Sequence, residues 1–545
     1  ERLRLETKAA LRWAKKAQRA GNDEHSDELD DAFKRGEEAY KYSKKVEKKH
    51  GLLVDEKSLA QSDARRSYGE VAQLLSEESK EIRACWLDRR SIVSGGPGKV
   101  REKIEELNKA GINQIYFESD NGGYALHNST VLKKNPDLEK WNDWDPLQEA
   151  IDAAHARGMK IEAWSKAFAV CNRVLDDQFR QKYPDRKFPA EGPVLSEHKA
   201  INENYGDWAL RMADGSLPQR TTDLFIDPAN PKAREFAQNV ILELSQNYRD
   251  LDGFQYDYIR YPFHNEQMGF TENNWKQFQT RFQRYSEMQK PDHPSKMSGQ
   301  MLRDWNEWKV SQIDCFVQDT STKLLLKNPN FDISAAVYPS DLKQTVRQEW
   351  GRWLKNGWVK TLNPMTYVPH DVHSKNAEFT SEFANKFRSD IREIQKESGG
   401  AGKLLPGIAV ARVNPGGVIK QIEIAQRMGL PGETLFASSV LDSGRLKELE
   451  AYNAKTAFSE FASLLSSVWS VPEKDPSSRL QHQRFIRDAK NLARCLADRN
   501  QEKDDGDARQ QLEAFKSEIN FWLDQNPHEK TAWTDAFRKR LSKIR

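Results

Sequence analysis

The feature that most constrains the fold of this chain is a regular alternation of short apolar runs and helical patterns between residues 83 and 438. Eight runs have the length and apolar character of buried strands, and amphipathic segments separate them. The candidate strands are 83–88, 114–119, 160–166, 253–259, 331–338, 359–367, 404–410 and 433–438. The clearest helices between them are 99–110, 145–157, 231–248 and 416–428. Because alternating strands and helices form parallel sheets covered by helices, the sequence predicts an α/β fold.

Eight strand–helix units predict a (β/α)8 TIM barrel, in which the active site lies at the carboxyl ends of the strands. A doubly wound sheet is the alternative, and it is expected to carry a glycine-rich phosphate turn after its first strand. The segment Ser94-Gly95-Gly96-Pro97-Gly98 follows the first candidate strand but lacks the GxGxxG spacing and the Walker lysine. We therefore expect this segment to cap the first helix, and we favour the barrel.

Both ends of the chain differ from this central region because they are highly charged and helical in pattern. Apolar residues recur at helical spacing near the start, at Leu29, Phe33 and Tyr40, and in two stripes near the end. Those stripes are Phe485, Ala489, Leu492, Leu496 and Leu512, Phe515, Ile519, Leu523. The sequence thus predicts a helical bundle at 1–80, the barrel at 81–452 and a second helical bundle at 453–545.

Composition excludes several classes of protein. The 85 Lys and Arg residues nearly balance the 82 Asp and Glu residues, so there is no electrostatic footprint for nucleic acid. The four cysteines lie far apart, which disfavours a zinc ribbon or a disulfide scaffold. No stretch approaches the ~20 apolar residues of a membrane span. The chain begins at Glu1 without an apolar signal segment, as a trimmed product would, so export to the periplasm or cell envelope stays open.

The end of the fourth candidate strand carries the clearest functional signal. Asp257 stands among tyrosines in the run 251–262, with Arg260 close by. Strand alternation places Asp257 on the face opposite to Tyr258. One interpretation is a structural ion pair between Asp257 and Arg260. The other is a catalytic carboxylate that the arginine holds in place, because an ionised aspartate near a barrel strand's end is unfavourable without partners.

Other strand ends add carboxylates, amides and aromatic rings to the same predicted rim. These residues are Glu118 and Asp120 after the second strand, Glu162 and Trp164 on the third, Tyr338 and Asp341 after the fifth, and Asn363, Met365 and Tyr367 on the sixth. Two long connections, 167–229 and 260–297, are expected to wall the cleft. Of the loop tryptophans Trp141, Trp144, Trp164, Trp208 and Trp275, we expect about half to face it.

This inventory is typical of glycoside hydrolysis, which needs one carboxylic acid, a second carboxylate and flat aromatic surfaces. We expect Asp257 to be the nucleophile or charge stabiliser. The candidates for the general acid are Glu118, Glu162, Asp120 and Asp341, with Glu118 and Glu162 preferred because neighbouring rings favour the protonated carboxyl form. No cofactor is expected. His370, Asp371 and His373 lie close together, but no third ligand follows on another strand, so we expect no metal site.

Several segments together resemble the glycosyl hydrolase-like family 10. They are RACWLDR (83–89), AGINQIYFESDNGGYALH (110–127), HARGMKIEAWSKAF (155–168), DGFQYDYIRYP (252–262), LNPMTY (362–367) and MGLPGETLFASSVL (428–441). The resemblance implies a TIM-type barrel that hydrolyses glycosidic bonds in a polysaccharide, with a bacterial cell-wall or amino-sugar glycan as the expected substrate. By position, the family's strand-four aspartate is Asp257.

The resemblance also carries two departures. Some relatives have a second acidic residue directly after the aspartate, where this chain has Tyr258, and many have His-Ala-Trp where this chain has Glu162-Ala163-Trp164. The residues expected to contact the glycan are Asp120, Trp164, Tyr258, Arg260, Tyr261, Tyr338, Asp341, Asn363, Met365 and Tyr367.

The Tyr258 departure supports an alternative, a non-catalytic glycan-binding or scaffold protein that retains the barrel cleft. In either case the helical flanks are expected to bind cell-wall polymer, to self-associate or to brace the barrel.

Overall fold

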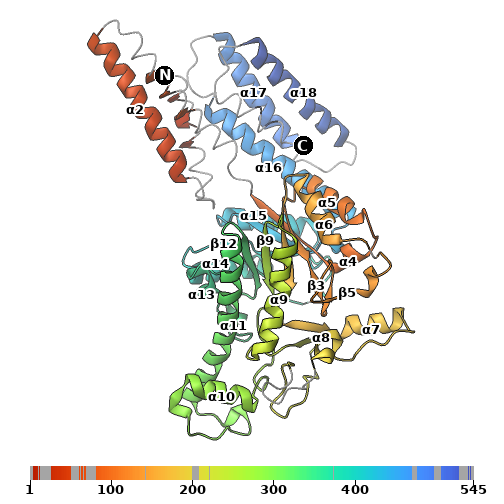
Figure 1. Ribbon diagram of the computed structural model, residues 1–545. Coiled ribbons are helices and arrows are strands. Elements are labelled where there is room, and N and C mark those ends of the chain that lie inside the picture. Colours follow the sequence, from red (N-terminus) through yellow and green to blue (C-terminus); the bar gives the residue numbers. More distant parts are fainter. Residues whose placement is uncertain are drawn as a thin grey trace. The chain divides into compact units, whose positions relative to one another are not determined.

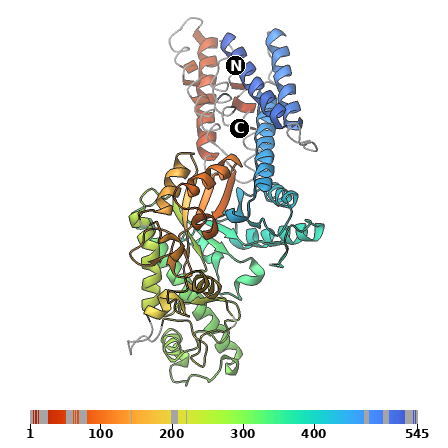
Figure 2. The same ribbon diagram turned by 90° about the vertical axis from the view of Figure 1, so that its right-hand side faces the viewer.

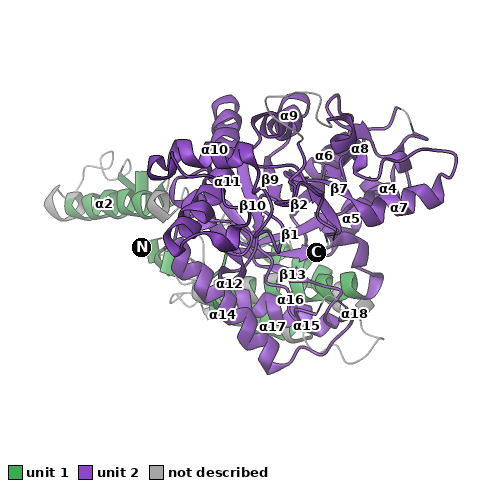
Figure 3. Cartoon of the chain, turned by 90° about the horizontal axis from the view of Figure 1, so that it is seen from below, with its two compact units in different colours: residues 1–81, 426–431, 445–545 green, residues 82–425, 432–444 purple. Residues whose placement is uncertain are grey.

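The computed structural model of the protein describes most of the chain. It covers residues 81–468 apart from 142, 199–207, 220 and 372, the helices at 26–50, 476–495 and 505–526, and short pieces at 4–5, 7–9, 11–12, 60–61, 63–64, 67–68, 538 and 541. The chain divides into two compact units (Figure 3). Unit 1 comprises residues 1–81, 426–431 and 445–545, and unit 2 comprises 82–425 and 432–444.

Unit 2 is built on one nine-stranded sheet in which all neighbouring strands are parallel. The strands are β1 (Ile82–Leu87), β2 (Gln114–Glu118), β6 (Lys160–Lys166), β9 (Gly253–Asp257), β10 (Asp332–Val337), β11 (Thr361–Pro364), β12 (Lys403–Leu404), β13 (Gly407–Ala409) and β14 (Gly432–Phe436). Their order in space is β12-β11-β10-β9-β6-β2-β1-β14-β13. All eight predicted strands are therefore present, and the predicted parallel α/β arrangement is confirmed.

The two edge strands of this sheet are consecutive in the chain. Only Leu405 and Pro406 separate β12 from β13, and their backbones continue the pairing in both directions. Leu405 N–H donates to Leu362 O at 2.9 Å, and Thr434 N–H donates to Pro406 O at 3.0 Å. The seventh predicted strand, 404–410, is thus present as two short pieces, which pair with the strands on either side.

Helices surround the strands of unit 2, whose labelled strands lie at the centre of Figure 3. The longer helices are α5 (Lys99–Lys109), α6 (Pro146–His155), α7 (Arg173–Lys182), α9 (Pro231–Asn247), α10 (Glu272–Arg281), α11 (Gly299–Lys327), α14 (Ser381–Ser398) and α15 (Pro415–Arg427). The shorter ones are α4 (Arg89–Val93), α8 (Gly192–Glu197), α12 (Ser340–Lys343) and α13 (Trp350–Lys355), with single 3-10 turns at Pro136–Leu138, Gln283–Tyr285, Pro294–Lys296 and Ser438–Val440. Side-chain caps from Asp145 and Asn230 start α6 and α9 by accepting hydrogen bonds from backbone N–H groups of their first turns.

Inside the curled sheet, buried polar side chains form one continuous hydrogen-bond network. Glu162 accepts hydrogen bonds from Gln114 Nε2 at 2.7 Å and from Ser334 Oγ at 2.6 Å. Gln255 Nε2 donates to Asn363 Oδ1 at 2.9 Å, and Asn363 Nδ2 donates to Thr434 Oγ1 at 2.8 Å. Because these groups satisfy one another, the interior can be polar without a large desolvation penalty.

The two long connections differ in their placement. The first contains an antiparallel pair, β7 (Ala169–Asn172) and β8 (Asp223–Phe225), and it contributes several residues to the cavity described below. In the second, Phe270, Trp275 and Phe278 pack against Trp305 and Trp308 of α11. Only Arg260, the first residue of this second connection, lines the cavity. The expectation that both long connections wall the cleft is therefore confirmed for 167–229 but not for most of 260–297.

A buried lysine anchors the start of that second connection. Lys309 of α11 donates from Nζ to Asn265 O at 2.7 Å, to Asn265 Oδ1 at 2.9 Å and to Met268 O at 3.3 Å. Asn265 Nδ2 in turn donates to Pro262 O at 2.6 Å and to Thr345 O at 2.7 Å. The loop that follows Asp257 is therefore held to α11 by completely buried polar contacts.

Replacing Lys309 by Met is expected to lower the free energy of unfolding by about 2–4 kcal/mol, because buried oxygens of Asn265 and Met268 would lose their donor. Urea unfolding of the full chain measures this. Lys327→Met on the same helix is the matched control, since Lys327 is exposed, and it should change the stability by less than about 0.5 kcal/mol. Equal stabilities of the two variants would contradict the anchoring role.

Unit 1 contains the described helices of both flanks, α2 (Ser26–His50), α17 (Pro476–Cys495) and α18 (Asp505–Gln525), and most of α16 (Ser443–Val468) (Figure 1, Figure 2). α2 ends immediately before Gly51. In the two predicted stripes of α17 and α18 the described residues are buried, and Phe485 meets Phe515 edge-on at 6.1 Å. Leu29 and Leu496 lie outside the residues whose side chains the structure describes.

The residues of both flanks group into one unit, whereas the sequence suggested two bundles. The domain limits at 80 and 452 remain a prediction.

Among the described residues, no helix combines the length and the apolar character needed to cross a lipid bilayer.

Candidate active site

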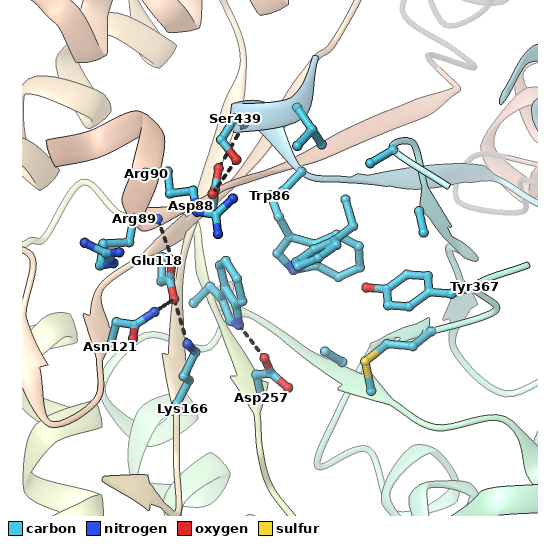
Figure 4. A pocket seen from close by; sticks show the side chains of 18 of the residues that line it. Trp86, Asp88, Arg89, Arg90, Glu118, Asn121, Lys166, Asp257, Tyr367 and Ser439 are labelled. Atoms are coloured by element: carbon cyan, nitrogen blue, oxygen red, sulfur yellow. Dashed lines mark hydrogen bonds and ion pairs between the residues drawn. The ribbon is translucent and has the colours of Figure 1, made fainter. Parts of the chain in front are cut away.

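A cavity of about 700 Å³ lies at the carboxyl ends of the parallel strands of unit 2. Residues near, at or just beyond the ends of the parallel strands line it: Trp86, Glu118, Trp164, Lys166, Asp257, Ala336, Met365, Ala409 and Phe436. The connections after the strands, including α4 and α7, add Asp88, Arg89, Arg90, Asn121, Val174, Tyr258, Arg260, Tyr338, Tyr367, Lys375, Arg412 and Ser439, among others. Figure 4 shows Glu118, Lys166 and Asp257 beside one another, with Trp86 in the middle of the view and Tyr367 on the opposite side.

Glu118 is a buried carboxylate surrounded by donors. Its Oε2 accepts a hydrogen bond from Arg89 N–H at 2.5 Å, and its Oε1 accepts one from Asn121 Nδ2 at 2.5 Å (Figure 4). Lys166 Nζ lies 2.8 Å from Glu118 Oε1. All three contacts are with donor groups, and Lys166 adds a positive charge beside the carboxylate.

Asp257 ends β9 and has a different environment. Trp164 Nε1 donates to its Oδ2 at 3.0 Å, and Tyr258 N–H donates to its Oδ1 at 2.7 Å. Burial raises the pKa of the Asp257 carboxyl, although Arg260, Lys166 and the two donors act in the opposite direction. The backbone of Tyr258 is left-handed, with φ of 49°, which is uncommon outside glycine. This turn ends the strand before Ile259, and it brings Tyr258 to the cavity, whereas alternation had placed Tyr258 on the opposite face.

Lys166 stands between the two carboxylates in the sheet. β6 lies between β2 and β9, with Glu118 paired to Trp164 and Lys166 paired to Asp257 in the register. Burial lowers the pKa of Lys166, but the charge and hydrogen bond of Glu118, together with Tyr258 and Asp223, outweigh it, so the pKa is raised. Lys166 therefore remains a cation that neutralises part of the negative charge at the strand ends.

Aromatic rings form a continuous surface next to these charges. Phe436 is 38% exposed, and its ring lies 5.7 Å from that of Trp86 and stacks on Tyr367 at 5.5 Å. Trp164 lies 6.3 Å from Trp86. Exposed aromatic faces beside polar groups are typical of small-molecule and sugar sites.

Asp88 is the third carboxylate of the cavity, and it connects the first strand to the last. Its Oδ1 accepts hydrogen bonds from Ser438 Oγ and Ser439 N–H, both at 3.0 Å, and its Oδ2 accepts one from Ser439 Oγ at 2.7 Å. These bonds occupy Asp88 with the turn after β14, which favours a structural role.

The structure brings together eight of the predicted site residues around the cavity: Glu118, Trp164, Asp257, Tyr258, Arg260, Tyr338, Met365 and Tyr367. Arg260 and Asp257 make no hydrogen bond to each other, and the Arg260 guanidinium instead faces the rings of Tyr258 and Tyr338. The structural ion pair between Asp257 and Arg260, one of the two interpretations of the sequence, is therefore not formed.

Five predicted residues do not line the cavity, each for a physical reason. Glu162 and Asn363 belong to the buried network inside the sheet, because Glu162 is near the start of β6 rather than its end. Asp120 accepts a hydrogen bond from Lys166 N–H, and Tyr261 packs under Lys309 at 4.5 Å. Asp341 pairs with Lys386 at 3.1 Å on the surface.

Among the five loop tryptophans, Trp164 alone lines the cavity, so fewer face it than expected. Trp141 and Trp144 contact each other at 5.3 Å, Trp208 stacks on His198 at 3.7 Å, and Trp275 lies in the core beside Trp305.

Asp371 accepts hydrogen bonds from His373 N–H at 2.9 Å and from Ser374 Oγ at 3.4 Å within a local turn. In the described part of the chain, no group of three or more His, Cys, Asp or Glu side chains could hold a metal ion.

Sequence reasoning missed Trp86, Lys166, Arg412 and Phe436 as cavity residues. Strand alternation could have found two of them. Lys166 shares a face with Trp164, two residues earlier, and Phe436 is the last residue of its strand and shares a face with Thr434. Arg412 follows the interrupted seventh strand, where no periodic signal indicates its direction.

The fold and the cavity define an α/β protein with a polar and aromatic cavity at the carboxyl ends of parallel strands. Residues 81–421 match the glycosyl hydrolase-like 10 family, and the chain belongs to that family.

Its curated relatives include the glycosyl hydrolase DigH of Escherichia coli K12, which is 26% identical over 168 residues, covering 29% of this chain and 33% of DigH. DigH of Shigella flexneri matches to the same extent. The chain thus matches about a third of the length of these relatives.

Solved structures similar to this chain include two β-galactosidases. That of Marinomonas ef1 has a TM-score of 0.46 and 11% identity, with 71% of this chain and 61% of the other covered. That of Rahnella sp. R3 has a TM-score of 0.47 and 12% identity, with 77% and 64% covered.

Proposed function

We propose that this protein is a glycoside hydrolase that cleaves O-glycosidic bonds in a polysaccharide, with its active site in the cavity at the strand ends. One observation carries the proposal: two buried carboxylates, Glu118 and Asp257, line the same cavity as an aromatic surface. Glycoside hydrolysis requires such a pair of carboxyl groups on either side of the scissile bond.

We also infer that β12 and β13 together form the seventh strand of a closed eight-stranded TIM barrel. The sheet begins at β12 and ends at β13, and the two strands are separated by two residues. In such a barrel, catalytic groups come from the ends of several strands, as Glu118 and Asp257 do.

The environments of the two carboxyl groups support different roles. Asp257, whose pKa is raised by burial, is suited to donate a proton to the leaving oxygen. Glu118 accepts hydrogen bonds from Arg89 N–H and Asn121 Nδ2 and lies 2.8 Å from Lys166 Nζ, and this donor-rich setting suits it to act as nucleophile, base or charge stabiliser. This assignment exchanges the roles that the sequence favoured, and it leaves Glu162 out of the catalytic pair.

A bacterial cell-wall or amino-sugar glycan is the substrate class we propose, following the family resemblance of the sequence. The exposed ring of Phe436, with Trp86 and Tyr367 beside it, offers flat apolar surface for the faces of sugar rings. The cavity volume of about 700 Å³ lies in the range of small-molecule sites.

The test is an incubation of the purified full chain with cell-wall glycan strands, amino-sugar polymers and storage polysaccharides, with release of reducing ends as the readout. We expect release from a cell-wall or amino-sugar glycan. Calorimetry on the same glycans addresses the alternative: binding without release of reducing ends over long incubation would support a non-catalytic glycan-binding protein, as the presence of Tyr258 after Asp257 would suggest.

A further inference from the structure

Arg260 is a buried cation that forms no ion pair with a carboxylate in the described part of the chain, although its charge acts on the nearby Asp257. Its side chain is 7% exposed and lines the cavity, and its Nε has no hydrogen-bond partner. The guanidinium carbon lies 4.4 Å from the ring centre of Tyr258 and 5.0 Å from that of Tyr338. Arginine stays charged in proteins, and a buried charge is unfavourable unless an opposite charge accompanies it. The nearby Asp257 makes its hydrogen bonds to Trp164 and Tyr258 instead.

Basic side chains also outnumber acidic ones around the cavity. The acidic lining residues are Asp88, Glu118 and Asp257, and the basic ones are Arg89, Arg90, Lys166, Arg260, Lys375 and Arg412. Two of the six cations are paired with protein carboxylates, Lys166 with Glu118 and Arg89 with Asp137. The cavity thus carries an excess of positive charge, although the chain as a whole is nearly neutral at +3.

Arg412 is a second arginine that lines the cavity. Its guanidinium is 5.4 Å from the ring centre of Tyr367, and its Nη1 donates to the backbone oxygens of Pro369 at 2.9 Å and His370 at 3.3 Å. These bonds hold Arg412 in place, and both go to neutral backbone oxygens rather than to a carboxylate. Arg260 faces the ring of Tyr338 and Arg412 faces the ring of Tyr367, and all four residues line the cavity.

We propose that this cavity binds a glycan that carries an acidic group, and that Arg260 is the residue that receives this group. The inference rests on the proposed function for the sugar part of the ligand. A guanidinium offers two parallel N–H donors that match a carboxylate, and a sulfate ester presents the same pair of oxygens. The rings of Tyr258 and Tyr338 fix the plane of the guanidinium before the ligand arrives, which lowers the entropy lost on binding.

The experiment measures binding by calorimetry with three oligosaccharides of equal length: one with free carboxyl groups, the same compound with its carboxyl groups reduced to alcohols, and a sulfated analogue. Wild-type protein is expected to bind the carboxylate form at least tenfold more tightly than the reduced form. In Arg260→Gln this preference should fall to within about twofold. The control is Arg101→Gln, an exposed arginine on α5, which should retain the full preference.

Each outcome bears on the inference. Equal binding of the acidic and the reduced oligosaccharide by wild type overturns it, as does an unchanged preference in Arg260→Gln. If Arg260→Gln fails to fold, the wild-type comparison alone decides. Preference for the sulfated compound over the carboxylate assigns the site to a sulfate ester. If the protein prefers the acidic oligosaccharide but releases no reducing ends, the proposed hydrolase activity is wrong and the acidic-glycan inference is supported. If it hydrolyses glycans without preferring the acidic form, the activity is supported and the inference is wrong.

Discussion

Replacing Asp257 by Asn is expected to lower the rate of glycan hydrolysis by about 10²–10⁴-fold, the usual contribution of a positioned general acid. Asn keeps the shape of the side chain, and its oxygen can still accept the hydrogen bond from Trp164 Nε1 that is 3.0 Å long in the wild type. The amide cannot donate a proton to a leaving oxygen, so the loss should fall on kcat and leave KM little changed.

The matched control for this variant is Asp319→Asn, because Asp319 lies on the exposed side of α11 and pairs with Arg234. Its rate should equal that of the wild type. A leaving group that needs no protonation supplies a second check. An activated aryl glycoside should restore much of the activity of Asp257→Asn if Asp257 is the acid. Full activity of Asp257→Asn on the natural glycan would show that the proton comes from elsewhere.

The second large effect concerns Glu162, which lies in the buried network inside the sheet. Burial raises the pKa of its carboxyl from 4.5 to about 8, with Ser334 opposing the shift and Asp332 adding to it. The folded protein therefore holds this proton more tightly than the unfolded chain does. The stability that results is fully present below pH 4.5 and is lost as the pH rises through about 8.

Glu162→Gln is expected to remove this pH dependence. Gln has nearly the same shape and cannot ionise, so the variant should match the wild type near pH 5 and exceed it at pH 9. The upper limit of the difference is about 5 kcal/mol from the size of the pKa shift. Urea unfolding across this pH range measures it. Glu287→Gln, at an exposed carboxylate, should follow the wild-type curve at every pH. Parallel curves for wild type and Glu162→Gln would show that Glu162 is ionised in the folded protein.

Much of the fold could be predicted from the sequence because buried strands and amphipathic helices leave strong periodic signals. The third strand was predicted with both of its limits, Lys160 and Lys166. The prediction was less accurate where backbone geometry interrupts the period. Pro406 lacks an N–H group and lies in the gap between β12 and β13, and the left-handed Tyr258 ends β9 two residues early.

The candidate site was harder to predict, since residue type and membership of a strand do not show how far a residue lies from the end of the sheet that forms the cavity. Glu162 and Glu118 are both acidic residues on neighbouring strands, yet Glu162 is the third residue of its strand and Glu118 is the last of its own. Only the register between strands shows that one lies in the buried network and the other at the cavity. The sequence likewise did not show which way the loop tryptophans point, because a large ring in a connection packs as well into a local core as against a cavity.

The pairing of β1 with β14 has a consequence for the folding of this protein during its synthesis on the ribosome. Residues 82–85 align with residues 432–435, so the first strand must wait for some 350 residues of further synthesis before its second neighbour exists. The hydrogen bonds of Asp88 likewise cannot form until Ser438 and Ser439 have been synthesised. Until then one edge of β1 has no partner, and exposed strand edges promote aggregation. We therefore expect chains that stop before residue 432 to aggregate unless a chaperone is present. Pulse-chase synthesis of such truncated chains, with and without chaperone, would measure the aggregated fraction.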